Sequence, residues 1–151
     1  MSLMQVSRKV DYALRAVIYL STQDPEKSCS VAEIAGRQGV PPKFLAKIIQ
    51  DLIRGKLVKS KRGSDGGYSL ARPPHEISFR DVIETVDGPI TVNVCIDDPS
   101  NCNCFPGCKM FGVWNEVQHK VVDIFTRTTL ADLKLAPCQL PLSPSSLSSA
   151  A

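Results

Sequence analysis

The chain has 151 residues, of which 43% are hydrophobic and 22% are charged, and its net charge is only +3. This length suits one domain with an extension and allows a modest core. No hydrophobic run approaches the roughly 20 residues of a membrane-spanning helix, so no membrane partner is expected. The first ten residues lack the apolar centre of a signal peptide, which favours the cytoplasm and reduced cysteines.

The positive charge is concentrated in one segment. Residues 37–62 contain a single acid, Asp51. The eight basic residues of this segment are Arg37, Lys43, Lys47, Arg54, Lys56, Lys59, Lys61 and Arg62. The rest of the chain is therefore net negative. A basic segment in a mildly acidic protein indicates a surface that contacts a phosphate backbone, although most charged runs are simply solvated helix faces.

Two helices are predicted at the start of the chain. The first covers residues 7–21, with Ser7 as its N-cap and apolar residues at helical spacing. The second covers residues 31–38, because Ser30 and Glu33 have the spacing of a capping box. Gly39 ends this second helix.

A third helix starts at the pair Pro41-Pro42, since proline is tolerated in a first turn, and it stops at Gly55. Its predicted buried stripe consists of Leu45, Ile48, Ile49 and Leu52. The opposite face, at 100° per residue, carries Lys43, Lys47, Gln50 and Arg54. A short helix, a glycine turn and a second helix with a basic outer face indicate a helix-turn-helix, whose second helix enters the DNA major groove.

A β-hairpin is predicted directly after the third helix. Residues 57–62 form one strand, residues 63–67 a glycine-rich loop and residues 68–70 the return strand. The fold class is therefore mainly α: a winged helix-turn-helix with a two-stranded wing. Lys61 and Arg62 lie at the wing tip, where glycines allow close approach to DNA and an arginine can reach phosphate or the minor groove.

Two more helices are expected. Ser78 caps one over residues 79–87, which Gly88 ends. A long amphipathic helix covers about residues 109–126, and its apolar stripe consists of Met110, Val113, Trp114, Val117, Val121, Ile124 and Phe125. This stripe is wider than a small winged helix needs, so part of it is interpreted as a dimer interface; the alternative is an intrachain core helix. Residues 129–133 would form a last turn.

Four of the six cysteines fall in one turn-rich loop without helix or strand periodicity: Cys95, Cys102, Cys104 and Cys108. Thiolates select zinc, copper or iron–sulfur clusters over hard cations, so the loop indicates a metal site whose metal the spacing leaves open. One alternative is a closed, structural zinc site made by all four thiolates. Disulfides fit a reducing compartment poorly, and a thiol-redox enzyme would need a Cys-x-x-Cys on a βαβ pattern. No catalytic residues, and hence no enzyme, are expected.

Several segments together resemble the IscR/NsrR/RirA group of bacterial winged-helix regulators, the Rrf2 family. They are residues 9–16 (KVDYALRA), 62–68, 79–83, the cysteine loop and 129–133 (TLADL). The resemblance implies a homodimeric bacterial regulator, a repressor in the first instance, that binds double-stranded promoter DNA. It also implies an iron–sulfur cluster held by three cysteines, with 4Fe-4S favoured over 2Fe-2S, whose state reports nitric oxide, redox state or iron supply.

By position, the resemblance assigns the cluster ligands to Cys95, Cys102 and Cys108. Cys104 is a substitute for Cys102, since one residue separates them. Phe111 stands where IscR-like members have a histidine ligand. NsrR-like members instead use an aspartate from the first helix of the other subunit, and Asp11 occupies that place. The alternative for Asp11 is an ordinary exposed carboxylate.

The resemblance also places DNA contacts. It puts Lys43, Phe44 and Lys47 in the major groove and Arg62 in the wing contact. Together with Arg54 and Lys61 these residues form the predicted DNA-binding set. Gly55 lies one residue earlier than in the usual Gly-Leu-Val ending of the recognition helix.

The expected organisation has four parts. Residues 1–75 form the DNA-binding domain, and residues 76–108 the connecting helix and cluster-binding loop. Residues 109–136 form the dimerisation helix and a short turn, and residues 137–151 a disordered Pro/Ser-rich tail that contains an uninvolved Cys138. The cluster would set the angle between the two winged helices, and so the spacing of the half-sites that they bind.

Overall fold

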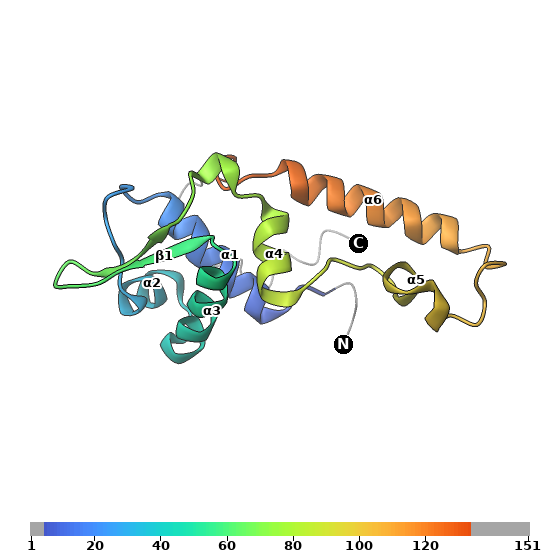
Figure 1. Cartoon of the computed structure of the whole chain (residues 1–151), viewed down its shortest axis with the longest axis horizontal. Coiled ribbons are helices and arrows are strands. Elements are labelled where there is room, and N and C mark those ends of the chain that lie inside the picture. Colours follow the sequence, from blue (N-terminus) through green and yellow to red (C-terminus); the bar gives the residue numbers. More distant parts are fainter. Residues whose placement is uncertain (1–4, 134–151) are drawn as a thin grey trace, which may run out of the picture.

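A computed structural model of the chain describes residues 5–133 (Figure 1). Its elements are α1 (Arg8–Ser21), α2 (Val31–Gln38), α3 (Pro42–Arg54), β1 (Val58–Lys61), β2 (Gly67–Leu70), η1 (Pro74–Glu76), α4 (Phe79–Asp87), α5 (Val94–Asp97), η2 (Pro99–Asn101) and α6 (Phe111–Arg127). We call residues 7–87 the head and residues 88–128 the arm. The head is a winged helix, and α6 extends away from it. The predicted fold class is confirmed.

Serine side chains cap the starts of α1, α2 and α4 in the head. Ser7 Oγ accepts a hydrogen bond from Val10 N at 3.3 Å, which caps α1 as predicted. At α4 the capping box is complete: Ser78 Oγ accepts from Asp81 N, and the Asp81 carboxylate accepts from Ser78 N. These side chains satisfy backbone N–H groups that a helix start leaves without a partner, which fixes where each helix begins.

The predicted capping box at α2 is only half formed. Ser30 Oγ accepts from Glu33 N at 3.1 Å. The Glu33 carboxylate instead accepts from Tyr19 Oη at 3.0 Å and pairs with Lys27 at 2.9 Å. A tertiary ion pair therefore replaces the local contact that the sequence spacing suggested. Gly39 ends α2 in the left-handed conformation, with φ at 63°.

The turn after α3 uses its glycine in an unexpected way. Gly55 is the C-cap, as predicted, but its φ is −77°, and the residue with positive φ is Lys56, at 57°. A Cβ on Gly55 would lie 2.4 Å from Thr85 Cγ2. Glycine is needed here because α4 packs closely against the turn, and Lys56 takes the conformation that glycine normally relieves.

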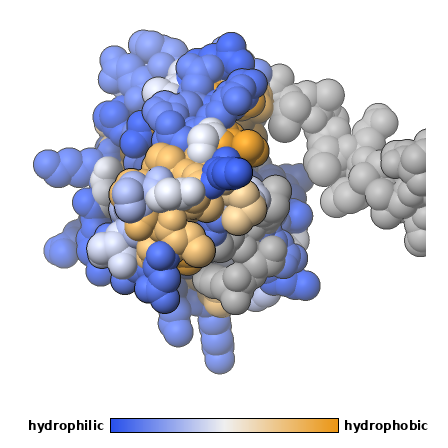
Figure 2. Space-filling view, turned by 90° about the vertical axis from the view of Figure 1, so that its right-hand side faces the viewer, coloured by the Kyte–Doolittle hydropathy of each residue, from blue (hydrophilic) through white to orange (hydrophobic). Residues whose placement is uncertain are grey.

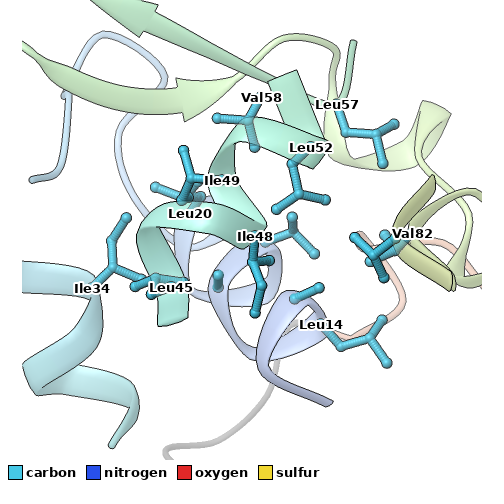
Figure 3. Packing of buried hydrophobic residues seen from close by; sticks show 14 of the residues in the cluster. Leu14, Leu20, Ile34, Leu45, Ile48, Ile49, Leu52, Leu57, Val58 and Val82 are labelled. Atoms are coloured by element: carbon cyan, nitrogen blue, oxygen red, sulfur yellow. The ribbon is translucent and has the colours of Figure 1, made fainter. Parts of the chain in front are cut away.

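The core lies where α1, α3 and α4 meet (Figure 3). The predicted stripe of α3 is fully inward: Leu45, Ile48, Ile49 and Leu52 are at most 1% exposed. Ile34 from α2, Leu57 and Val58 from the start of the wing, and Val82 from α4 close around it. Each fully buried aliphatic side chain contributes on the order of 1.5–3 kcal/mol of transfer free energy, so α3 is held by its apolar face while its other face stays in solvent.

The wing is anchored to the rest of the head by a short backbone contact. β1 and β2 pair antiparallel, from Val58↔Leu70 to Lys61↔Gly67. Tyr68 also pairs with Cys29, through N–H···O bonds of 2.8 and 2.9 Å. A Cβ on Gly67 would lie 2.7 Å from Cys29 O, so this glycine allows the wing to close on the loop before α2.

The arm is built differently from the head. No residue of α6 is buried within the chain, although this helix has 17 residues. Its C-terminal end is attached to the head: the rings of Phe125 and Phe79 lie 5.2 Å apart, Thr129 bridges to Ser78, and Leu130 is fully buried. The last turn predicted after this helix is present, closed by Asp132, whose carboxylate accepts from Thr129 N.

The cysteine loop contains more structure than predicted. Residues 94–97 form the single helical turn α5, capped by the Asn93 side chain, and residues 99–101 form a turn of 3₁₀ helix capped by Asp98. The loop has no helix or strand periodicity, as the sequence indicated, but these two single turns were not predicted. Single turns carry no periodicity, so only their caps could have revealed them. The tail predicted over residues 137–151, with Cys138, lies outside the described residues. Within residues 5–133, no helix is long and apolar enough to cross a membrane.

Candidate nucleic-acid interface and cysteine site

The outer face of α3 is the first candidate site. Lys43, Phe44, Lys47 and Arg54 are all exposed, opposite the buried stripe, as the periodicity predicted. Phe44 is 44% exposed and rests with its ring edge-to-face on Tyr12, at a centroid distance of 5.7 Å. An exposed aromatic ring held by α1 among lysines is suited to contact bases or sugars while the lysines contact phosphate.

An ion-pair network lies at the C-terminal half of this face. Asp51 pairs with Arg54 on its own helix and with Lys9 of α1, whose Nζ is 2.8 Å away. Lys9 also donates to the carbonyl of Val86 at 2.7 Å, so it joins α1, α3 and α4. The hydrogen bond from Lys9 lowers the pKa of Asp51, which stays ionised. The charge of Arg54 is thus shared with an acid, whereas within the described chain Lys43 and Lys47 belong to no ion pair.

Lys9 was not among the predicted site residues. It helps to line a hollow of about 440 Å³ on the face of α3, together with Phe44, Lys47, Ile48, Gln50, Asp51 and Arg54. Sequence periodicity places Lys9 on a different helix, so only the packing of α1 on α3 brings it here. The sequence held one signal for such a partner: Asp51 is the single acid of residues 37–62, and a carboxylate on a packed helix is expected to form an ion pair.

The wing supplies the second part of this interface. Lys61 and Arg62 are exposed at the end of β1, as predicted. The glycines beside them are needed by the hairpin itself, because a Cβ on Gly66 would lie 2.5 Å from Lys61 O. They allow the hairpin to close tightly. Contact of Lys61 and Arg62 with DNA remains a prediction.

The four cysteines of the arm differ in exposure. Cys95, in α5, is 8% exposed; Cys102 and Cys108 are half-buried, and Cys104 is exposed. All four are free thiols. Cys108 precedes α6 by three residues, and the ring of Phe111 packs on that of Phe105 at 5.1 Å. The residue that stands where IscR-like members have histidine therefore holds the loop against α6 instead of donating to a metal.

The chain by itself does not assemble a finished metal site. Among residues 5–133, no three His, Cys, Asp or Glu side chains are placed to hold one metal ion. Neither the predicted set of Cys95, Cys102 and Cys108 nor the four-thiolate zinc set is preformed. The donor chemistry still fits a soft metal, because the loop presents free sulfur ligands and no competing disulfide.

Asp11 lies on α1, away from the cysteine loop in sequence, and is half-exposed. Its carboxylate pairs with Arg15 one turn later, at 3.0 Å. Exposed pairs of this kind contribute about 0.3–0.5 kcal/mol, so the pair is easily exchanged for a stronger interaction. The assignment of Asp11 as a ligand for a partner's cluster remains a prediction.

The arm also carries exposed apolar residues. Figure 2, which views the end of the molecule at the cysteine loop and the start of α6, shows a hydrophobic patch near its centre. Exposed apolar residues of this region are Val94, Phe105, Met110 and Val113, which are 40–64% exposed. A groove of about 650 Å³ also runs between the start of α1, residues 87–92 and α6. Apolar surface of this extent on one side of a helix is typical of a protein interface.

A family model described as "Iron-dependent Transcriptional regulator", Rrf2, matches residues 6–135. The chain belongs to the Rrf2 family. It is a helix-turn-helix transcriptional regulator, and the resemblance noted from its motifs is confirmed. Rrf2 proteins of this kind are regulators and not enzymes, as was expected for this chain.

Individual Rrf2 relatives agree with this assignment. A putative HTH-type transcriptional regulator of Mycobacterium tuberculosis is 36% identical over 130 residues, covering 86% of this chain and 81% of the relative. Among solved structures, CymR, the global cysteine regulator of B. subtilis, matches with a TM-score of 0.72 and 30% identity, covering 87% and 96% of the two chains. IscR from T. potens matches with a TM-score of 0.70 and 29% identity, covering 93% and 94%.

Proposed function

We propose that this Rrf2 protein is a homodimeric repressor whose affinity for its operator depends on an iron–sulfur cluster in the cysteine loop. The observation that carries the proposal is a loop of four free cysteines placed directly before a helix that leaves Val113 and Ile124 exposed and fully buries none of its residues. A family description that names iron dependence supports the choice of metal. The exposed face of α3 and the wing supply the contact with double-stranded DNA.

In this proposal Cys95, Cys102 and Cys108 hold the cluster, and Asp11 of the partner subunit supplies a fourth, oxygen ligand. Cys104 is the substitute for Cys102. When bound, such a cluster offers a site of reaction with nitric oxide or oxygen, because an oxygen ligand holds iron less firmly than thiolate does. The chain's own part is to bring its loop against α6. To release Asp11 for the partner, Arg15 must give up its ion pair.

The DNA-binding step rests on charge and geometry. Lys43, Phe44 and Lys47 contact the major groove, and Arg54 and Lys61 contact phosphate. Arg62 reaches phosphate or the minor groove from the wing. Two copies joined through α6 present two recognition helices, so the operator is a pair of half-sites whose spacing depends on the dimer's shape. A change in that shape alters affinity only if the two shapes bind the operator differently.

The test compares operator binding by holo and apo protein at one fixed salt concentration, because phosphate contacts make affinity salt-dependent. Anaerobic purification should give a brown protein containing iron and sulfide. The triple variant C95A/C102A/C108A should lose cluster and regulation, while C138S, which removes a cysteine that the proposal leaves unused, should behave as wild type. Equal affinities of holo and apo protein, or a colourless protein containing zinc, would contradict the proposal.

The dimer is tested separately. Val113 is 62% exposed on α6, and Val113→Asp would place a charge in the interface without touching the core of the head. We expect dimerisation to weaken at least about tenfold, equivalent to about 1.4 kcal/mol, by sedimentation or light scattering. Glu116→Gln, a change on the charged side of α6, is the matched control. An unchanged dimer in the Val113→Asp variant would place the interface elsewhere.

A further inference from the structure

Residues 88–93 connect α4 to the cysteine loop, and they are held by one side chain of α6. Gln118 Nε2 donates to the carbonyl of Ile90 at 2.6 Å, and Gln118 Oε1 accepts from Val92 N at 3.0 Å. Within the described chain these are the only non-local hydrogen bonds of residues 89–93. A single amide thus pairs with the extended segment as a neighbouring β-strand would, through one donor and one acceptor.

Such a two-point contact fixes register as well as proximity. A carbonyl and an N–H two residues apart must both meet the same amide, so sliding the segment by one residue breaks both bonds. The site is partly buried beside the apolar groove under α6, where an unpaired polar group costs about 1–3 kcal/mol. The segment therefore has one preferred position along α6.

That position determines where Cys95 arrives. Cys95 follows Val92 by three residues, which span at most about 10 Å. Gln118 lies seven residues after Phe111, the first residue of α6, which is about 10 Å along a helix. The segment and α6 run side by side in opposite directions (Figure 1), and α5 contacts α6. Fixing residues 90–92 at Gln118 therefore places Cys95 toward the start of α6, which follows Cys108 by three residues.

The geometry points to Gln118 as a positioning residue of the cysteine site: its amide sets the register of residues 90–92 on α6 and so holds Cys95 beside the start of that helix. The ring contact between Phe105 and Phe111 holds the loop at its other end. The inference rests on the proposed function for its purpose, and it explains how the loop and the proposed dimer helix act as one unit.

The experiment uses Gln118→Met, which keeps length and helix propensity but cannot pair with the segment. Lys120→Met, at an exposed position two residues later, is the matched control. In the cluster-free protein we expect hydrogen exchange of a peptide spanning residues 90–92, and N-ethylmaleimide labelling of Cys95 relative to exposed Cys104, to speed up about tenfold in Gln118→Met only. Unchanged exchange and labelling in Gln118→Met would overturn the inference.

A second variant guards against misfolding. Gln118→Glu keeps the acceptor for Val92 N and loses the donor to Ile90, so it should give intermediate exchange and labelling rates. After reconstitution, the visible absorbance of the cluster should decay in air several-fold faster in Gln118→Met than in Lys120→Met. Wild-type protein that takes up no cluster would refute the proposed function, while the exchange and labelling results would still decide the role of Gln118.

Discussion

The head of this protein encloses a hydrophobic core, whereas the long helix of the arm buries none of its residues. The head encloses a core in which Leu45, Ile49 and Leu52 are completely buried, and serine side chains begin three of its helices. The arm contains a helix of 17 residues with no buried residue and no side-chain cap at Met110, where it begins. The head is thus stable through contacts within one chain. The arm leaves apolar side chains exposed, among them Met110, Val113 and Ile124.

The largest effect is expected from truncation in the core. Ile49→Ala removes a fully buried side chain and should lower the free energy of unfolding by about 2–5 kcal/mol. Val113→Ala makes a comparable truncation on the arm and should cost under about 0.5 kcal/mol in the monomer, because that side chain already faces solvent. Urea unfolding at low protein concentration measures both. Equal losses would abolish the distinction between head and arm.

The next effect concerns the turn between α3 and the wing. Gly55→Ala places a methyl group against Thr85 and should destabilise the head by about 1–3 kcal/mol. Lys56→Gly, the neighbouring change, should stabilise it by up to about 1 kcal/mol, since φ at 57° is unfavourable for lysine. Thermal unfolding distinguishes the two. A stabilising Gly55→Ala would mean that the turn can move away from α4.

Helix starts give a smaller contrast. Ser78→Ala removes a complete capping box from the head and should cost about 1 kcal/mol. Met110→Ala, at the uncapped start of α6, should change stability by less than about 0.5 kcal/mol. Denaturant titration of both variants tests this difference. A large loss for Met110→Ala would show that this 64% exposed side chain already has a partner in solution.

The smallest effect depends on pH. The hydrogen bond from Lys9 lowers the pKa of Asp51 in the folded state. The ionised carboxylate therefore stabilises the fold above the unfolded pKa, about 3.9, and this contribution disappears as the pH falls through the lower folded value. Asp51→Asn should cost about 1 kcal/mol or less near neutral pH, because both cationic partners are partly exposed. Unfolding curves of the two proteins should converge in acid.

Much of the head could be predicted from sequence because its signals are local. Ser7, Ser78 and Gly39 mark helix ends through contacts within four residues, and the apolar periodicity of α3 identifies its buried face. The errors arose where tertiary contacts took over. Glu33 bonds to Tyr19 and Lys27 instead of completing its box, and Lys56 takes the left-handed conformation because Gly55 is needed against Thr85.

The arm could be predicted less well for a related reason. Its cysteines were recognised by residue type, but α5 has a single turn and no periodicity to reveal it. Convergence of the thiols is not encoded by spacing, and the chain alone does not produce it. Lys9 and Gln118 could not be identified from sequence either, because their partners lie 77 and up to 28 residues away. Such contacts depend on how helices pack and not on any local pattern.

The attachment of the C-terminal end of α6 to the head has a mechanical consequence. Phe125, Thr129 and Leu130 fix the helix to the head, while its beginning carries the cysteine loop. Seventeen residues make a lever of about 25 Å, so each degree of rotation at the pivot moves the tip by about 0.4 Å. Small displacements near Phe79, at the start of α4, are thereby magnified at the sulfur atoms. Conversely, restraining the start of α6 restricts how far the head can tilt relative to bound DNA.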